Sequence, residues 1–132
     1  VIPALIRKFV TAVEQDDNEV VLWGTGEASS EFLFVKDAAR GIVDAMEKHE
    51  GSDPINLGTG KEIKIKDVAN LIGSLVGYKG KIVYDTSKPD GQPRRCLNVE
   101  KAKQAFGFEA TTDFNEGLKE TIQWYKNQWH ME

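Results

Sequence analysis

The sequence lacks several features that would place it in a common functional class. Its one cysteine, Cys96, cannot form an internal disulfide. No apolar run reaches the roughly 18 residues that a membrane-spanning helix needs. Acidic residues outnumber basic ones by 21 to 17, so there is no overall basic field to attract nucleic acid or an anionic membrane. We therefore expect a cytoplasmic protein that has neither nucleic acid nor a membrane as a partner.

The loops that bind phosphate groups through glycine are also missing. Neither Gly-x-Gly pair continues to the third glycine of a dinucleotide-binding turn, because Ser29 and Ile63 stand at that place. The segment that ends in Gly-Lys is no P-loop, because Glu62 replaces the Ser or Thr that would hold magnesium. The sequence therefore predicts no cofactor-binding residues of its own.

Catalytic and metal-binding patterns are absent as well. The two histidines, His49 and His130, are isolated in the sequence, and neither lies close to the cysteine. Tyr84 and Lys88 have the Tyr-x-x-x-Lys spacing of a dehydrogenase, in which both residues lie on one side of a helix. Here the pair extends from the end of an expected strand to a Pro-Asp-Gly turn, so the required helical geometry is unavailable. We expect no catalytic residue and no metal site, and a chain that is inactive alone.

Apolar periodicity predicts alternating helices and short strands. The expected strands are 20–23, 32–34, 54–58 and 81–84. The expected helices are 2–13, one with Asp37 in its first turn, 66–76 with Gly77 as its cap, a short one capped by Asn98, and a final one capped by Asp113. The inner face of the second helix is expected to be Val35, Ala38, Ala39, Ile42, Val43 and Met46. One α/β (α+β) domain over residues 1–132 follows.

Five stretches, in this order and spacing, resemble one known family. They are VIPALIRKF at 1–9, WGTG at 23–26, EFLFVKD at 31–37, INLGTG at 55–60 and KPDGQPRR at 88–95. Together they resemble the C-terminal substrate-binding lobe of extended short-chain dehydrogenase/reductases, the NAD-dependent epimerase/dehydratase family, of the GDP-fucose-synthase kind.

The resemblance implies a fragment of a longer chain, with short strands packed by helices and without the N-terminal Rossmann half. That half would bind NAD or NADP and would carry the catalytic tyrosine. The first residue is not Met and already reads as helix, which agrees with a missing upstream portion. The implied partner is a nucleoside diphosphate sugar.

The arginines of the KPDGQPRR stretch are the best candidates for binding a diphosphate. Arg94 and Arg95 follow two prolines and a glycine, which present the cations from a loop that does not collapse. In the family pattern the second basic position, here Arg95, points at the diphosphate. The alternative is a pair of surface arginines in a polar loop.

Other substrate contacts are carried over from the family. Trp23 would offer its ring to the base, Val1 and Leu5 would wall the base, and Asp90 would accept a ribose hydroxyl. The alternatives are core packing for the tryptophan, helix packing for Val1 and Leu5, and turn formation for Asp90. Ser30 departs from the pattern, because the family has an arginine there, seven residues after the tryptophan.

The missing arginine leaves several possibilities open. Lys36, Arg40 or a group from the absent half could replace it, or the chain could bind its nucleotide sugar more weakly or accept a different one. Two other functions remain as alternatives. The first is a stand-alone binding or interaction module that self-associates through the apolar strand at 55–57. The second is an unrelated structural domain whose glycine loops are ordinary turns.

Overall fold

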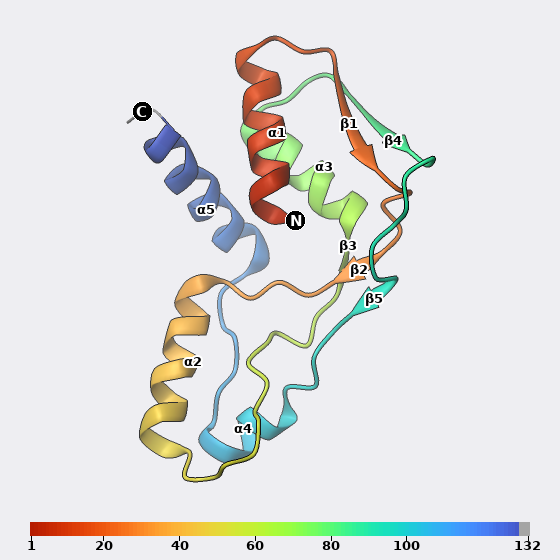
Figure 1. Cartoon of the computed structure of the whole chain (residues 1–132). Coiled ribbons are helices and arrows are strands. Elements are labelled where there is room, and N and C mark those ends of the chain that lie inside the picture. Colours follow the sequence, from red (N-terminus) through yellow and green to blue (C-terminus); the bar gives the residue numbers. More distant parts are fainter. Residues whose placement is uncertain (130–132) are drawn as a thin grey trace.

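The computed structural model describes residues 1–129 and has a mixed α/β fold (Figure 1). The elements are α1 (Ile2–Glu14), β1 (Glu19–Trp23), β2 (Ser29–Ser30), α2 (Val35–Lys48), β3 (Ile63–Lys64), α3 (Ile65–Val76), β4 (Lys81–Asp85), β5 (Arg94–Arg95), α4 (Glu100–Phe106) and α5 (Phe114–Trp129). The predicted order of helices and strands is confirmed for all five helices and for the strands at 20–23 and 81–84. No helix within residues 1–129 has the length and apolar character to cross a membrane.

The larger part of the molecule consists of α1, α3 and α5 with the parallel pair β1 and β4. Apolar residues three and four apart give each helix one buried stripe, and these stripes meet around Phe9 and Ile72, both 0% exposed. Leu118 and Ile122 of α5 close the core from the other side. Gly77 ends α3 in the left-handed conformation, with φ 86°, as its position in the sequence predicts.

A small three-stranded sheet lies in the middle of the molecule, and each of its strands has two residues. β2 pairs antiparallel with β3 and parallel with β5, so the order is β3-β2-β5. The predicted strand at 32–34 is wrong, because the pairing occurs earlier, at Ser29–Ser30, and Phe32 packs against the main core instead. This sheet carries the predicted arginines.

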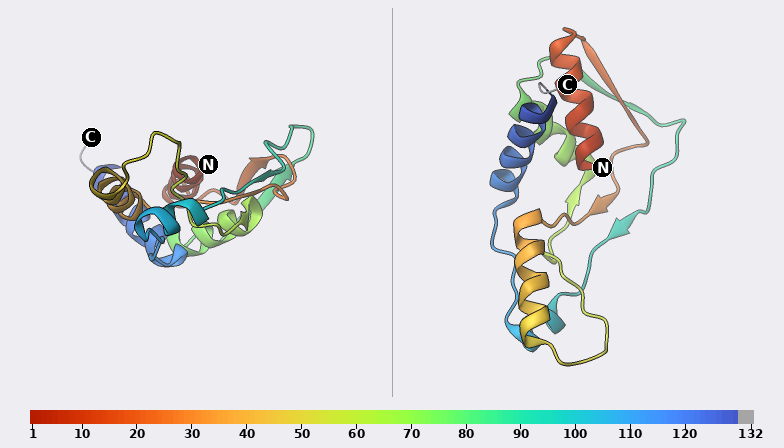
Figure 2. Two further views of the ribbon diagram at one scale, coloured as in Figure 1. Left: turned by 90° about the horizontal axis from the view of Figure 1, so that it is seen from below. Right: turned by 60° about the vertical axis from the view of Figure 1, so that its left-hand side comes forward.

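The smaller part of the molecule, at the far end of the long axis, contains α2 and α4 (Figure 2). Its cluster is Ala102, Phe106 and Phe108, with Ile55 and Leu57 packed against it. The predicted strand at 54–58 is also wrong: residues 54–58 are in no strand. These residues have no neighbouring strand with which to pair, and their apolar side chains serve the cluster.

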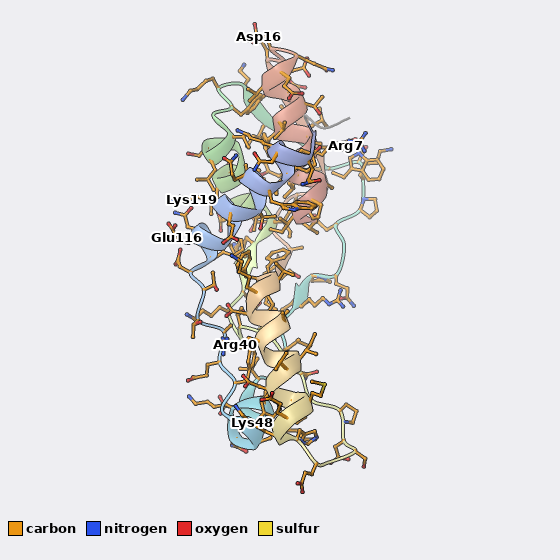
Figure 3. All side chains as sticks on the ribbon, turned by 90° about the vertical axis from the view of Figure 1, so that its left-hand side faces the viewer. Arg7, Asp16, Arg40, Lys48, Glu116 and Lys119 are labelled. Carbon is orange, nitrogen blue, oxygen red and sulfur yellow. The ribbon has the colours of Figure 1, made fainter. Side chains whose placement is uncertain are left out.

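The expected inner face of α2 is largely exposed. Only Asp37 and Gly41 of this helix are buried, and Gly41 allows close contact, since an added Cβ would meet Phe108 at 2.7 Å. Figure 3 shows α2 extending below α5, with Arg40 and Lys48 along it. No described element covers the expected face, whose exposed members are Val35 (69%), Ile42 (61%), Val43 (47%) and Met46 (77%).

Candidate functional site

Trp23 ends β1 at the edge where the two parallel strands finish. Its Cα partner is Asp85 at the end of β4, and Gly24, with φ 81°, turns the chain away. The indole is 70% exposed, so the core-packing alternative is wrong. The ammonium of Lys88 lies 5.7 Å from the centre of the ring, within the range of a cation–π interaction. An exposed aromatic face beside a cation is suited to a flat, anionic ligand.

Asp90 fastens the loop after β4 onto the turn after β1. Its Oδ1 accepts a hydrogen bond from the Thr25 amide at 2.7 Å, and its Oδ2 accepts one from the Thr25 hydroxyl at 2.7 Å. These two bonds hold the pKa of the Asp90 carboxyl below its usual value. A side chain at position 24 would collide with this carboxylate, because an added Cβ would lie 2.2 Å from Oδ1. The contact with a ribose hydroxyl stays a prediction.

The two arginines of β5 point to opposite faces of the small sheet, because side chains alternate along a strand. Arg94 is paired with Ser29 and Arg95 with Ser30. On the first face, the Arg94 Nε donates to both oxygens of Glu62 at 3.0 and 2.9 Å, and its Nη2 donates at 2.5 Å. Hydrogen bonds from Arg94 and Ser29 lower the pKa of Glu62. Arg94 is thus engaged by Glu62, although its side chain stays 70% exposed.

Arg95 is the exposed cation on the other face. Within residues 1–129 its side chain has no hydrogen-bond or ion-pair partner. Its register partner, Ser30, offers no second positive charge. The two proposed replacements are engaged elsewhere: Lys36 pairs with Glu120, and the Arg40 guanidinium donates to Asp37 at 2.9 Å. A diphosphate bound beside Arg95 and Ser30 would therefore contact one cation, the guanidinium of Arg95.

The predicted base contacts at the start of the chain differ in exposure. Val1 precedes α1 and is 61% exposed, whereas Leu5 is 6% exposed within the main core. The burial of Leu5 favours its helix-packing alternative. Contacts of either residue with a base stay predictions.

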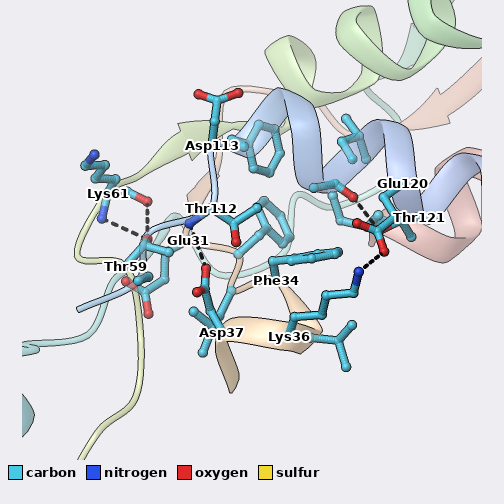
Figure 4. A pocket seen from close by; sticks show the side chains of 18 of the residues that line it. Glu31, Phe34, Lys36, Asp37, Thr59, Lys61, Thr112, Asp113, Glu120 and Thr121 are labelled. Atoms are coloured by element: carbon cyan, nitrogen blue, oxygen red, sulfur yellow. Dashed lines mark hydrogen bonds and ion pairs between the residues drawn. The ribbon is translucent and has the colours of Figure 1, made fainter. Parts of the chain in front are cut away.

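A cavity of about 1040 Å³ lies between the segment 31–37 and α5. Figure 4 shows Phe34 inside it, the ion pair of Lys36 with Glu120 at one side, and the contact of Asp37 with Thr112 at another. None of the predicted substrate-binding residues lines this cavity. It therefore belongs with the exposed surface of α2 and not with the surface around Trp23 and Arg95.

Asp37 is a buried carboxylate, 4% exposed, at the start of α2. It accepts hydrogen bonds from Arg40 at 2.9 Å, the Thr112 amide at 2.9 Å and the Thr111 hydroxyl at 3.3 Å. Burial by itself raises the pKa of this carboxyl, but the bonds from Arg40 and Thr112 outweigh burial and hold the pKa well below its usual value. Asp37 is a structural anion that ties α2 to the chain before α5.

Sequence reasoning missed two residues that shape this surface. Thr25 holds Asp90, and Glu62 holds Arg94. Both partners are more than 30 residues away in the chain, and no local pattern marks them. Within residues 1–129 there is no group of three or more His, Cys, Asp or Glu that could hold a metal ion. His130 lies outside the described residues.

Comparison with known proteins places these features in context. Residues 1–121 match the family profile described as GDP-mannose 4,6 dehydratase. Probable GDP-L-fucose synthase 1 of Oryza sativa subsp. japonica is 43% identical over 125 residues, which cover 95% of this chain and 38% of that protein. GDP-L-fucose synthase of Escherichia coli (strain K12) is 42% identical over 134 residues, covering 95% and 41%.

A solved structure shows the same arrangement of elements. The GDP-L-fucose synthetase from Naegleria fowleri, bound to NADP, has a TM-score of 0.91 and 31% identity, covering 98% of this chain and 41% of that one. The chain thus spans about two fifths of the length of these relatives.

Proposed function

Because this chain belongs to the GDP-mannose 4,6 dehydratase family, we propose that it is the nucleotide-sugar-binding portion of an NAD(P)-dependent sugar epimerase, dehydratase or reductase. The relatives named GDP-L-fucose synthase suggest a GDP-linked hexose as the substrate. In this proposal residues 1–132 are a single binding domain from the C-terminal part of a longer chain. The name of the Naegleria fowleri structure supports NADP as the cofactor of the remaining portion.

The observation that carries the proposal is the exposure of Trp23, with Lys88 beside its ring, together with the exposed Arg95 of β5. The exposed indole stacks on the base, and the cation beside it balances negative charge on the ligand. Arg95 extends from β5 and donates charge-assisted hydrogen bonds to the diphosphate. Thr25 and Asp90 fasten the loop after β4 to the turn after Trp23, which orders one end of the segment that leads to Arg95.

The residues of this chain bind and orient the nucleotide sugar, and the chemical step depends on the portion outside it. NADP supplies a hydride when bound to the remaining portion. The exposed face of α2 and the neighbouring cavity offer the apolar surface against which that portion packs.

Calorimetric titration of the chain with GDP tests the proposal. We expect Arg95→Ala to weaken GDP binding about ten- to a hundredfold, because a charge-assisted hydrogen bond contributes about 1.5–3 kcal/mol. Binding should also weaken as salt rises. Lys119→Ala, which removes an exposed cation of α5, is the matched control and should leave affinity unchanged. A chain that binds neither GDP nor another nucleoside diphosphate would contradict the proposal.

A second candidate function is a stand-alone module that self-associates. The structure changes the surface that would do this. Ile55 and Leu57 lie in the segment that the sequence predicts as the association surface, but they pack against the cluster of Ala102, Phe106 and Phe108. By contrast, Ile42 and Met46 of α2 are 61% and 77% exposed. An exposed apolar helix face of this kind is an association surface, and the α2 face is therefore the proposed contact between copies.

Light scattering over a range of protein concentrations tests this candidate. We expect a concentration-dependent rise in mass that the double variant Ile42→Lys and Met46→Lys abolishes. The control is Glu47→Lys, which changes the charge of the same helix outside the apolar face. A chain that is monomeric at high concentration would exclude self-association.

A further inference from the structure

The geometry points to Glu62 as a positioning residue for the anion-binding strand: it holds Arg94, and through Arg94 it fixes β5 so that Arg95 faces the ligand. In this arrangement Arg94 does not touch the diphosphate. The inference deepens the proposed function, on which it rests, because it assigns different tasks to two adjacent arginines.

The contact between Glu62 and Arg94 is a two-donor fork that crosses the small sheet. The single N–H of Arg94 Nε is shared between Oε1 and Oε2 of Glu62, at 3.0 and 2.9 Å, and Nη2 donates to Oε2 at 2.5 Å. The Ser29 hydroxyl adds a bond to Glu62 Oε1 at 2.8 Å. Glu62 immediately precedes β3, Ser29 belongs to β2, and Arg94 belongs to β5. One carboxylate therefore ties the three strands together.

The small sheet needs such a tie because its strands are very short. The backbone bonds that flank the pairing of β5 with β2 include those from the Ser29 amide to Pro93 and from the Glu31 amide to Arg95, both 3.0 Å. Two residues in each strand leave little cooperative support for the register. The nearby cation Lys64 forms its ion pair with Glu27, at 2.8 Å. It therefore does not compete with Arg94 for the carboxylate of Glu62. The fork thereby fixes which face Arg95 occupies.

A direct role of Arg94 in binding phosphate conflicts with this arrangement. Side chains of consecutive strand residues point to opposite faces, so a ligand at Arg95 and Ser30 lies on the face away from Glu62. The charge of Arg94 is also compensated by the carboxylate it binds. If Glu62 only neutralised a ligand-binding Arg94, its removal would tighten binding, whereas a positioning role predicts the reverse.

Titration of the 132-residue chain with GDP distinguishes these signs. We expect Glu62→Gln to weaken GDP binding about two- to fivefold, the range that loss of an exposed ion pair gives. Asp44→Asn is the matched control, because it removes the same charge from the ion pair with Lys48 in α2, and it should leave affinity unchanged. Tighter or unchanged binding by Glu62→Gln would overturn the inference.

Exchanging the two charges separates positioning from contact. The double variant Glu62→Arg and Arg94→Glu should restore GDP affinity to within about twofold of the unaltered chain, because the fork reforms with reversed ends. If Arg94 contacted the diphosphate, the carboxylate at position 94 would repel the ligand, and the double variant would bind worse than Glu62→Gln. That result would refute the inference.

Amide hydrogen exchange tests the fork without a ligand. In Glu62→Gln the amides of Ser29 and Glu31, which bond to the β5 segment, should exchange several-fold faster, while those of α3 keep their protection. Unchanged exchange at both amides would contradict the inference even if GDP binding fell. If the unaltered chain does not bind GDP, the proposed function is overturned. The role of the fork in ligand binding, which rests on that function, is then overturned as well.

Discussion

Replacing Asp37 by Asn should destabilise the fold, because this carboxylate joins α2 to the segment before α5. Asn keeps the shape of the side chain but turns one oxygen into an N–H donor. In the unaltered chain, Arg40 and the Thr112 amide each donate to one oxygen of Asp37. In either orientation of the asparagine amide, its NH2 group would therefore face one of these two donors. One buried hydrogen bond to a charged acceptor is lost and one donor is left without a partner.

The magnitude follows from these contacts. Loss of a hydrogen bond to a charged group costs about 1.5–3 kcal/mol, and loss of an anion from the first turn of a helix adds about 0.3–1 kcal/mol. We therefore expect the free energy of unfolding to fall by about 2–4 kcal/mol. For a chain of 132 residues this corresponds to a fall in Tm of about 7–14 °C.

Thermal unfolding followed by circular dichroism at several pH values measures the effect. The folded chain holds the pKa of Asp37 below the ordinary 3.8, so the unfolded chain binds the proton more readily. The contribution of Asp37 is therefore complete above about pH 5 and is lost as the pH falls toward the lower folded pKa. The difference between Asp37→Asn and the unaltered chain should shrink below pH 3.8.

A matched variant in the same helix makes the test specific. Asp44 forms an exposed ion pair with Lys48 at 2.8 Å, and Asp44→Asn should change stability by less than about 0.5 kcal/mol. If Asp37→Asn melts within about 1 °C of the unaltered chain, or if its deficit is the same at pH 7 and pH 3, the assignment of Asp37 as a charged structural tie is refuted.

Two further predictions concern the ligand surface. Trp23→Leu should weaken GDP binding about two- to tenfold, since stacking on the indole contributes about 0.5–1.5 kcal/mol. In the unaltered chain, GDP should quench the indole fluorescence. Equal affinity of Trp23→Leu and the unaltered chain for GDP would exclude stacking. Ser30→Arg places a second cation beside Arg95 on the same face and should tighten GDP binding about tenfold at low salt; calorimetry showing unchanged or weaker binding would mean that the ligand does not occupy this face.

The predictions from sequence that the structure confirms rest on local patterns. Apolar spacing of three and four residues predicts α1 and α3, and Gly77 predicts the end of α3. Asp113 accepts hydrogen bonds from the amides of Asn115 and Glu116, as the predicted cap requires. These signals need only neighbouring residues.

Patterns that need a partner from elsewhere in the chain gave wrong predictions. The apolar stripe of α2 has the spacing of a buried face, but burial also needs a surface against which to pack, and no described element provides one. The segment at 54–58 reads as a strand, yet a strand forms only when another strand supplies its hydrogen bonds. Both segments have the sequence of packed elements and lack their neighbours in this chain.

The sequence by itself determined the helices, the lack of catalytic and cofactor motifs, and the likeness that pointed to Trp23 and the two arginines. Only the tertiary structure decided that Trp23 is exposed and that Arg94 binds Glu62 while Arg95 faces Ser30. The physical reason is that a two-residue strand has no periodicity of its own. The direction of each arginine depends on the register of β5 against β2, and contacts between residues far apart in the chain set that register.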